Sequence, residues 1–415
     1  MNKKSAFALL VALVLCLTGC LPGNGQQPST TAPTVGDPTY ITVTVPPETE
    51  PTEPETAPSI PETTAPITEP STEPGTEPTT EPTTAPTTEP TTEPTTEPTI
   101  PEPEVVQITL SFTGDCTFGQ NQKHSYWNSF SEMYDNKGPD YFLQGVREIF
   151  QQDDLTIINL EGSLTTSEDR QDKKWNHKGD PEYVQIMTGS SVEVATMGNN
   201  HRLDYGQSGC DETMEVLEEA GITYCFDDLY AICEVKGVKV GIVSVTGWVG
   251  DTWLKEGYSY LREQGCAIVV ACIHWGTNYV VEVDDNQKYL GRRAIDIGYD
   301  LVVGNHPHIL QGMQMYKGKM ICYSLGNFCY GGNKNPDDKD SGIFQQTFTV
   351  VDGELQSDVD ARFIPCKLSS TNTRNDYQPT LVHGEEFDRI IDKMNGYNAV
   401  FDFALDEEGR VIPEE

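Results

Sequence analysis

The sequence predicts an α/β fold for residues 105–415, and two features of this region support the prediction. Short apolar runs rich in β-branched residues recur along it, and amphipathic helical segments separate several of them. The runs are apolar almost throughout, which is typical of strands that are buried on both faces of a sheet. Strands that alternate with helices favour sheets covered by helical layers.

The predicted strands extend from the start of this region to residue 327. They are residues 107–114, 155–160, 192–198, 239–247, 267–275, 300–305 and 320–327. Beyond Ser341 the sequence reads as paired strands over residues 342–363, with a turn at the sequence VDGE. The pattern does not reveal the order of the strands.

Glycine and proline residues mark the ends of several predicted helices. Pro139 opens the first of them, and two others end in a glycine, as is common at helix termini. The predicted helices are residues 139–152, 209–221, 286–298 and 384–395.

The first 19 residues are predicted to be a signal peptide. Lys3 and Lys4 precede an apolar stretch that is too short for a permanent membrane span. The stretch ends in LTGC, which is similar to the bacterial lipoprotein cleavage box and predicts a lipid on the thiol of Cys20. We therefore expect a lipid-anchored protein on the extracellular face of the cytoplasmic membrane of a Gram-positive bacterium. An ordinary secretory signal that happens to end in cysteine is the alternative.

Residues 20–104 are predicted to be a disordered linker. They consist largely of Thr, Pro and Glu, and a proline recurs at every fourth position from Pro66 to Pro98. Such a composition cannot bury enough apolar surface to offset its ordering entropy. The linker would act as a stalk between the lipid on Cys20 and a domain that spans residues 105–415.

Net charge limits the partners that this domain can have. The chain has 27 basic and 64 acidic residues, and the first 104 residues hold 2 and 15 of them, which leaves 25 and 49, or −24, for the domain. This charge disfavours nucleic acid and anionic lipid surfaces as partners.

The domain also has nine cysteines, an odd number that excludes complete internal pairing. Buried free thiols are favoured over a bridge between Cys225 and Cys233.

Polar residues that can bind metal follow one apolar run after another. Because the carboxyl ends of strands in an open α/β sheet share one edge, these residues are expected to converge there. Oxygen and imidazole groups together are typical ligands of a divalent transition metal. The residues are Asp115, Asn159, Glu161, Asn199, Asn200, His201, Asp204, His274, Asn305, His306, His308, Ser324 and Asn327.

Six short motifs resemble those of the CapA family of bacterial capsule and poly-γ-glutamate synthesis proteins. They occur in the order of the family and cover roughly residues 108–330. CapA proteins are similar in turn to the calcineurin-like metallophosphoesterases, which implies two packed mixed sheets with helices outside and a metal site at the strand ends. The motifs are GD at 114–115, NLEGSL at 159–164, NNHRLDYG at 199–206, HWGTNY at 274–279, GNHPHILQG at 304–312 and YSLGNF at 323–328.

The resemblance implies roles for individual residues. One or two divalent ions (Mn, Fe or Zn) would be held by Asp115, Glu161, Asn200, His274, His306 and His308, with Glu161 as a possible bridge between ions. His201 would lie near the leaving group, and Asp204 would either orient His201 or bond to the backbone. Asn159, Asn199 and Asn327 are expected to contact substrate.

One position departs from the phosphoesterase pattern, because Thr117 stands where a histidine ligand is usual. The departure implies one tight ion or two of unequal affinity. The other histidines, His124, His177 and His383, lie in polar segments and are assigned no role.

Two functions remain open at this point. The first is a metal-dependent hydrolase or transferase that acts on poly-γ-glutamate or a related anionic envelope polymer, at a phosphoester or a γ-amide bond. The second is a non-catalytic component that binds the polymer and assists its export, within a capsule-synthesis complex. In both, the membrane is contacted only through the N-terminal lipid.

Overall fold

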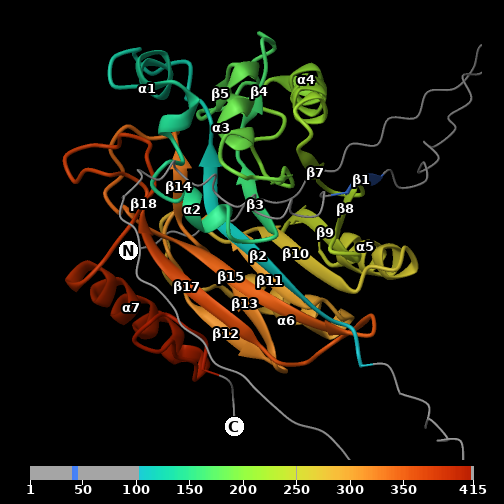
Figure 1. The fold of residues 1–415 in the computed structure, drawn as a ribbon. Helices are drawn as coiled ribbons and strands as arrows, with labels where there is room; N and C mark the ends of the chain where they lie inside the picture. The colour runs from blue at the N-terminus through green and yellow to red at the C-terminus, as the bar shows by residue number, and fades with distance from the viewer. Residues whose placement is uncertain (1–39, 45–101, 249, 413–415) are drawn as a thin grey trace, which may run out of the picture. The chain divides into compact units, whose positions relative to one another are not determined.

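The computed structural model describes residues 40–44, 102–248 and 250–412 (Figure 1). The predicted signal peptide, Cys20 and most of the predicted linker lie outside these residues. Within the described part the predicted α/β fold is confirmed, since two mixed β-sheets carry helices on their outer faces. No helix of the described part is both long enough and apolar enough to cross a bilayer.

The first sheet has a parallel centre and antiparallel edges. Strands β9, β10, β11 and β13 run parallel, while β8 is antiparallel to β9 and β12 is antiparallel to β13. In spatial order the strands are β1 (Tyr40–Thr44), β8 (Tyr230–Val235), β9 (Val238–Thr246), β10 (Ile268–His274), β11 (Leu301–Asn305), β13 (Lys319–Cys322) and β12 (Met313–Tyr316).

The second sheet is also mixed. Strands β2, β3, β6 and β7 run parallel, and β15 pairs antiparallel with β2 on the other side. In spatial order the strands are β18 (Thr380–Leu381), β17 (Asp360–Lys367), β15 (Asp340–Val351), β2 (Val105–Thr117), β3 (Leu155–Leu160), β6 (Val194–Thr196) and β7 (Thr223–Cys225). Strand β14 (Asn327–Tyr330) also pairs with β2, β16 (Glu354–Leu355) pairs with β15, and β4 (Ser163–Leu164) pairs with β5 (Lys178–Gly179).

The helices fall into three groups by what they cover, and the first group, α1–α4, belongs to an apolar cluster with Ile158 and Leu160 of the second sheet. Helices α5 and α6 bury Leu254, Leu261 and Leu290 against the first sheet, and α7 packs on β12 and β17 (Figure 1). The helices are α1 (Phe130–Lys137), α2 (Arg147–Phe150), α3 (Gln185–Thr188), α4 (Gly206–Glu219), α5 (Thr252–Glu263), α6 (Asp285–Ile297) and α7 (Glu385–Asn398). Single 3₁₀ turns are η1 (Pro139–Tyr141), η2 (Pro181–Val184) and η3 (Ala399–Phe401).

The largest apolar cluster lies between the two sheets. Ile108 and Phe112 of β2 belong to the same buried cluster as Val240, Ile268 and Val270 of the first sheet. Because both inner faces are apolar, the sheets are held together by the burial of this surface. The nine cysteines of the described part are all buried free thiols, as predicted, and Cys225 does not bridge Cys233.

The predicted helix over residues 139–152 is wrong. This segment forms η1 and α2, separated by a turn in which Phe142 and Leu143 are buried. At Gly145 the chain passes so close to the carbonyl oxygen of Pro379 that a Cβ atom there would lie 2.5 Å from it. Tertiary packing of this turn overrides the local helical preference.

Strand β1 is also unexpected, because Tyr40–Thr44 fall within the segment predicted to be a structureless linker. The strand pairs in parallel with β8 over its whole length. The sequence YITVT contains Tyr, Ile and Val and no proline, whereas the Thr-rich repeats that follow have a proline at every fourth position from Pro66 to Pro98.

Candidate metal centre

The residues expected at the strand ends do converge. Asp115 is in the last part of β2, Glu161 directly follows β3, and His274 and Asn305 are the last residues of β10 and β11. Asn199, Asn200 and His201 occupy the loop after β6. The two sheets therefore contribute residues to a single site at their carboxyl ends.

Asp115 is directed into the site by an irregularity in β2. The ladder between β2 and β3 shifts register between Phe112 and Asp115. Next to it, a Cβ atom on Gly114 would lie 2.1 Å from the carbonyl oxygen of Gly326, so only glycine permits this close approach. The backbone N–H of Asp115 donates to that same carbonyl at 2.8 Å. Such bulges commonly re-aim a side chain next to a functional site.

Glu161 lies in an unusual environment for a carboxylate. Its side chain is fully buried, and neither carboxylate oxygen has a hydrogen-bond partner among the described residues. Burial raises the pKa of Glu161 to about 8, with His308 opposing the shift and Asp115 adding to it. A buried carboxylate without hydrogen bonds is unfavourable unless a cation accompanies it, so this environment suits a metal ion.

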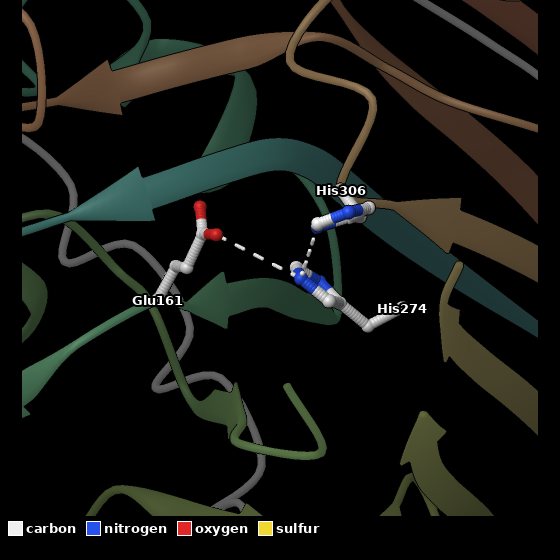
Figure 2. A group of neighbouring side chains, drawn as sticks. All are labelled: Glu161, His274 and His306. Atoms are coloured by element: carbon white, nitrogen blue, oxygen red, sulfur yellow. Dashed lines mark hydrogen bonds and ion pairs between the residues drawn. The ribbon is translucent and has the colours of Figure 1, made fainter. Parts of the chain in front are cut away.

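The first group of candidate ligands comprises Glu161, His274 and His306. Figure 2 shows the three side chains directed toward one another from separate segments of the chain. Nε2 of His274 lies 2.9 Å from Nδ1 of His306, and Oδ1 of Asn200 lies 2.7 Å from the same Nε2. Burial lowers the pKa of His306 to about 4 and that of His274 well below its ordinary value. Both imidazoles are thus neutral at pH 7, the state in which histidine binds metal.

The second group comprises Asp115, Glu161 and His308. Nδ1 of His308 lies 3.0 Å from Oδ2 of Asp115 and 3.0 Å from Oδ1 of Asn327. Burial lowers the pKa of His308, but Glu161 and Asp115 outweigh this effect and raise it to about 9. Glu161 belongs to both groups, which is the position expected of a residue shared by two ions.

The backbone around Pro307 is held in an unusual conformation. His306 has φ of 100° and His308 has φ of 61°, and both values are uncommon for residues other than glycine. The carbonyl of Pro307 accepts a hydrogen bond of 2.8 Å from the backbone of Tyr279, which itself has φ of 61°. Local strain of this kind is typical of functional sites, where the surrounding structure maintains it. The two histidines thereby enter different ligand groups.

His201 and Asp204 form a pair beside these groups. Nδ1 of His201 lies 2.7 Å from Oδ2 of Asp204, and Nε2 lies 3.7 Å from Oε1 of Glu161. The same Asp204 oxygen accepts a hydrogen bond from the backbone of His177, and Lys173 pairs with the other oxygen. Asp204 therefore does both things considered from the sequence: it contacts His201, and it bonds to backbone. Burial and the charge of Lys173 hold the pKa of His201 well below its ordinary value.

The three asparagines expected to contact substrate lie behind the candidate ligands. Asn159 donates to Oδ1 of Asp115 at 2.8 Å, and Asn199 donates to the Asn159 side chain at 3.1 Å. Asn327 donates to the backbone carbonyl of His308 at 3.0 Å. These bonds orient the ligands, as supporting residues do in metal sites. A contact with substrate stays a prediction for all three.

Thr117 has a structural role in place of the missing histidine. Its hydroxyl donates a hydrogen bond of 2.9 Å to the backbone carbonyl of Glu161. This bond ties the end of β2 to the segment that carries Glu161. Thr117 thus positions a candidate ligand and belongs to neither ligand group.

His177 is a site residue that the sequence analysis missed. Its side chain is buried, and its ring centre lies 4.2 Å from that of His201. It lies in a polar stretch directly before the two-residue strand β5, and no apolar run precedes it that would predict a position at a strand end. The other unassigned histidines are His124, which lines a neighbouring cleft, and His383, which is exposed.

The residues present fit a metal centre. All six candidate ligands predicted from the sequence lie together, the orphaned Glu161 carboxylate needs a cation, and two neutral imidazoles face it. Neutral nitrogen and anionic oxygen donors together suit Mn, Fe or Zn.

Comparison with known proteins gives a consistent picture. Residues 109–331 match the family described as bacterial capsule synthesis protein PGA_cap. Similar proteins include the PGA biosynthesis protein CapA of Bacillus subtilis, 29% identical over 54% of this chain and 63% of the relative, and the capsule biosynthesis protein CapA of Bacillus anthracis, 27% identical over 54% and 60%. A probable polyglutamine synthesis accessory protein of Mycobacterium tuberculosis is 24% identical over 52% and 66%. The match thus spans less than two thirds of the length of each of these relatives.

Proposed function

The chain belongs to the bacterial capsule synthesis protein family, within the metallophosphoesterase-like superfamily, and on this premise we propose that it is a metal-dependent hydrolase or transferase acting on an anionic envelope polymer. The observation that carries the proposal is the buried Glu161 carboxylate, which lacks hydrogen bonds and is shared by two groups of candidate ligands. The family supports poly-γ-glutamate or a related polymer as the substrate.

A divalent ion at this centre would polarise a carbonyl or phosphoryl oxygen and lower the pKa of water. Asp115, Glu161 and His308 would hold one ion, and Glu161, Asn200, His274 and His306 would hold another. Asn159 and Asn327 keep Asp115 and His308 in place, so that the ligands do not need to reorganise when the metal binds.

His201 is suited to move a proton at the leaving group. Asp204 holds Nδ1 of the ring and leaves Nε2, on the side of Glu161, free to take up a proton and pass it on. Burial raises the pKa of Asp204 and Lys173 opposes this shift, so the ion pair favours the ionised carboxylate, which orients the imidazole. The scissile bond is a γ-amide or a phosphoester under this proposal.

The chain would perform this function outside the cell. LTGC at residues 17–20 supports a lipid on Cys20, and the Thr-, Pro- and Glu-rich stretch would set the domain at a distance from the membrane. A capsule-synthesis complex is a fitting context, because two relatives are named for the biosynthesis of PGA or of a capsule.

A non-catalytic role in polymer binding and export is the second candidate. Thr117 favours it, since it replaces a ligand that phosphoesterases usually supply. In that case the ions would bind the polymer without cleaving it.

Two measurements on the full chain separate the candidates. Metal content is determined first, and the metal-loaded chain is then incubated with poly-γ-glutamate and with a generic phosphodiester. Cleavage of either, abolished in His201→Ala with metal still bound, supports the enzyme. Bound metal with neither substrate cleaved favours the export role.

A further inference from the structure

A cleft of about 470 Å³ opens beside the metal centre, on the side of His201 and His308. The first ligand group does not line it, since Glu161, His274 and His306 are absent from its walls. A substrate whose reacting bond lies next to His201 would therefore extend its leaving portion into this cleft.

The charge of the cleft is opposite to that of the chain. Its walls include Lys174 and Lys334 and contain no aspartate or glutamate, although the chain as a whole has a net charge of −37. Field lines concentrate in a recess lined by one sign of charge, so this recess favours an anionic ligand over its surroundings.

The two lysines differ in what they offer. The ammonium of Lys334 donates to the carbonyl oxygens of Ser125 and Trp127 and to the Ser125 hydroxyl, which uses its hydrogen-bonding capacity within the protein. The ammonium of Lys174 lies 4.7 Å from the ring centre of Trp175 and has no carboxylate partner among the described residues. Lys174 is thus the cation that remains available to a ligand.

Two histidines of the cleft, His124 and His177, each have a buried Nδ1 without a hydrogen-bond partner among the described residues, and His177 is the one beside His201. It lines the cleft beside His201, its side chain is only 3% exposed, and Nδ1 is buried without a hydrogen-bond partner among the described residues. A buried polar atom left unpaired destabilises a fold, so the fold itself gains nothing from an imidazole here. Burial and the neighbouring His201 hold the pKa of His177 well below its ordinary value, which makes the ring a neutral hydrogen-bonding group at pH 7.

The cleft also has two exposed aromatic residues. Trp175 is 48% exposed and Tyr279 is 58% exposed, and both line the cleft. Exposed rings at such positions cover the methylene groups of a bound chain while polar groups recognise its ends.

We propose that this cleft is a recognition subsite for a chain that carries both amide and carboxylate groups, in which His177 hydrogen-bonds an amide and Lys174 pairs with a carboxylate. This proposal rests on the proposed function for one point, the identity of the polymer. In it, residues outside the metal centre bind the part of the substrate that departs after cleavage.

The test measures binding to the metal-loaded full chain by calorimetry. One ligand is a γ-linked glutamate oligomer, and the other is the matching γ-linked glutamine oligomer, which keeps the amides and lacks the carboxylates. The variants are His177→Phe, which preserves the ring, and Lys174→Gln. The control is Lys317→Gln, which removes the same charge at the turn between β12 and β13, away from the cleft. Metal content and thermal midpoint are recorded for each.

We expect His177→Phe to weaken binding of both oligomers about tenfold while the thermal midpoint stays constant or rises, because an unpaired buried nitrogen has been removed. Lys174→Gln is expected to weaken only the glutamate oligomer, by about three- to tenfold, and to flatten the salt dependence of its binding. Lys317→Gln should change neither affinity.

Other results overturn the proposal. Unchanged affinity in His177→Phe together with a lower midpoint would assign His177 a structural role. Equal effects of Lys174→Gln and Lys317→Gln, or no binding of either oligomer by the parent chain, would also refute it. Cleavage is scored separately: if the chain binds the oligomers with this pattern but cleaves nothing, the hydrolase fails and the subsite stands.

Discussion

Nδ1 of His201 lies 2.7 Å from Oδ2 of Asp204, and Lys173 pairs with the other oxygen of the same carboxylate. The imidazole is therefore held in one orientation, with Nε2 toward Glu161. Three residues from a loop and a short polar stretch thus form one connected unit, which would transfer a proton under the proposed function. The Asp204 carboxylate must be ionised for this unit to hold the imidazole in the orientation that proton transfer would require.

Asp204→Asn is expected to reduce turnover by about 10²- to 10⁴-fold, because the amide does not hold the same imidazole tautomer. Metal content should stay the same, since Asp204 is in neither ligand group. Steady-state kinetics and metal analysis of the purified variant check both statements. A variant that loses metal would place Asp204 among the groups that support the ions instead.

Glu161→Gln is expected to have opposite effects with and without metal. In chelator-treated protein it should raise the free energy of unfolding by about 1–3 kcal/mol, because it replaces an unpartnered buried carboxylate by a neutral group. In metal-loaded protein the parent chain should be the more stable one, since bound ions add to its stability. Thermal or denaturant unfolding under both conditions measures the crossover. Destabilisation of the metal-free variant would contradict this account of Glu161.

Asp340 of β15 forms ion pairs with two residues of α7, and these pairs should make the free energy of unfolding depend on pH in the acidic range. It accepts two hydrogen bonds from Arg389, of 2.6 and 2.9 Å, and one of 2.8 Å from Lys393. Burial alone would raise the pKa of Asp340, but these two cations outweigh it and hold the pKa below its ordinary value. The contribution is therefore present above about pH 4 and is lost as pH falls through the folded-state value.

Asp340→Asn should lower the free energy of unfolding at pH 7 by about 1–3 kcal/mol, a range reduced because Arg389 is partly exposed. The difference from the parent chain should shrink below about pH 4. Asp296→Asn is the matched control, because its partner Lys317 is largely exposed and the pair should matter little. Denaturant unfolding of the three chains at several pH values decides. A difference that persists unchanged at low pH would rule out the ion pair as its source.

His306→Ala and His308→Ala should remove different ions, because the two histidines belong to separate ligand groups. Each variant should retain the ion of the other group with weaker affinity, since Glu161 is shared. Metal titration of the chelated variants followed by elemental analysis measures this. Loss of all metal in either variant would mean that the two groups act as a single site.

Much of the fold was predictable because buried strands are read from composition alone. Residues 155–160 were predicted as a strand and form β3 with the same ends. Strand β8 escaped prediction although Lys236 and Gly237, both with positive φ, form the turn of a hairpin with β9. The helix over residues 139–152 failed because its middle is shaped by contacts with residues near 379, which lie far away in sequence.

The candidate ligands were predictable for a related reason. Each of them follows an apolar run, and parallel strands bring their carboxyl ends to one edge. The division of His306 and His308 between two groups was not predictable, because it depends on the positive φ values around Pro307. His177 could not be predicted because it does not follow an apolar strand. Its place in the site comes from two tertiary contacts, one between its ring and that of His201 and one between its backbone N–H and Asp204.

Elemental analysis of the full chain, purified without chelator alongside Glu161→Gln, tests the central claim most directly. We predict one or two divalent transition-metal ions per parent chain and a near-complete loss from Glu161→Gln, because that carboxylate is common to both ligand groups. A parent chain that binds no such ion, or a variant that retains the full complement, would contradict it.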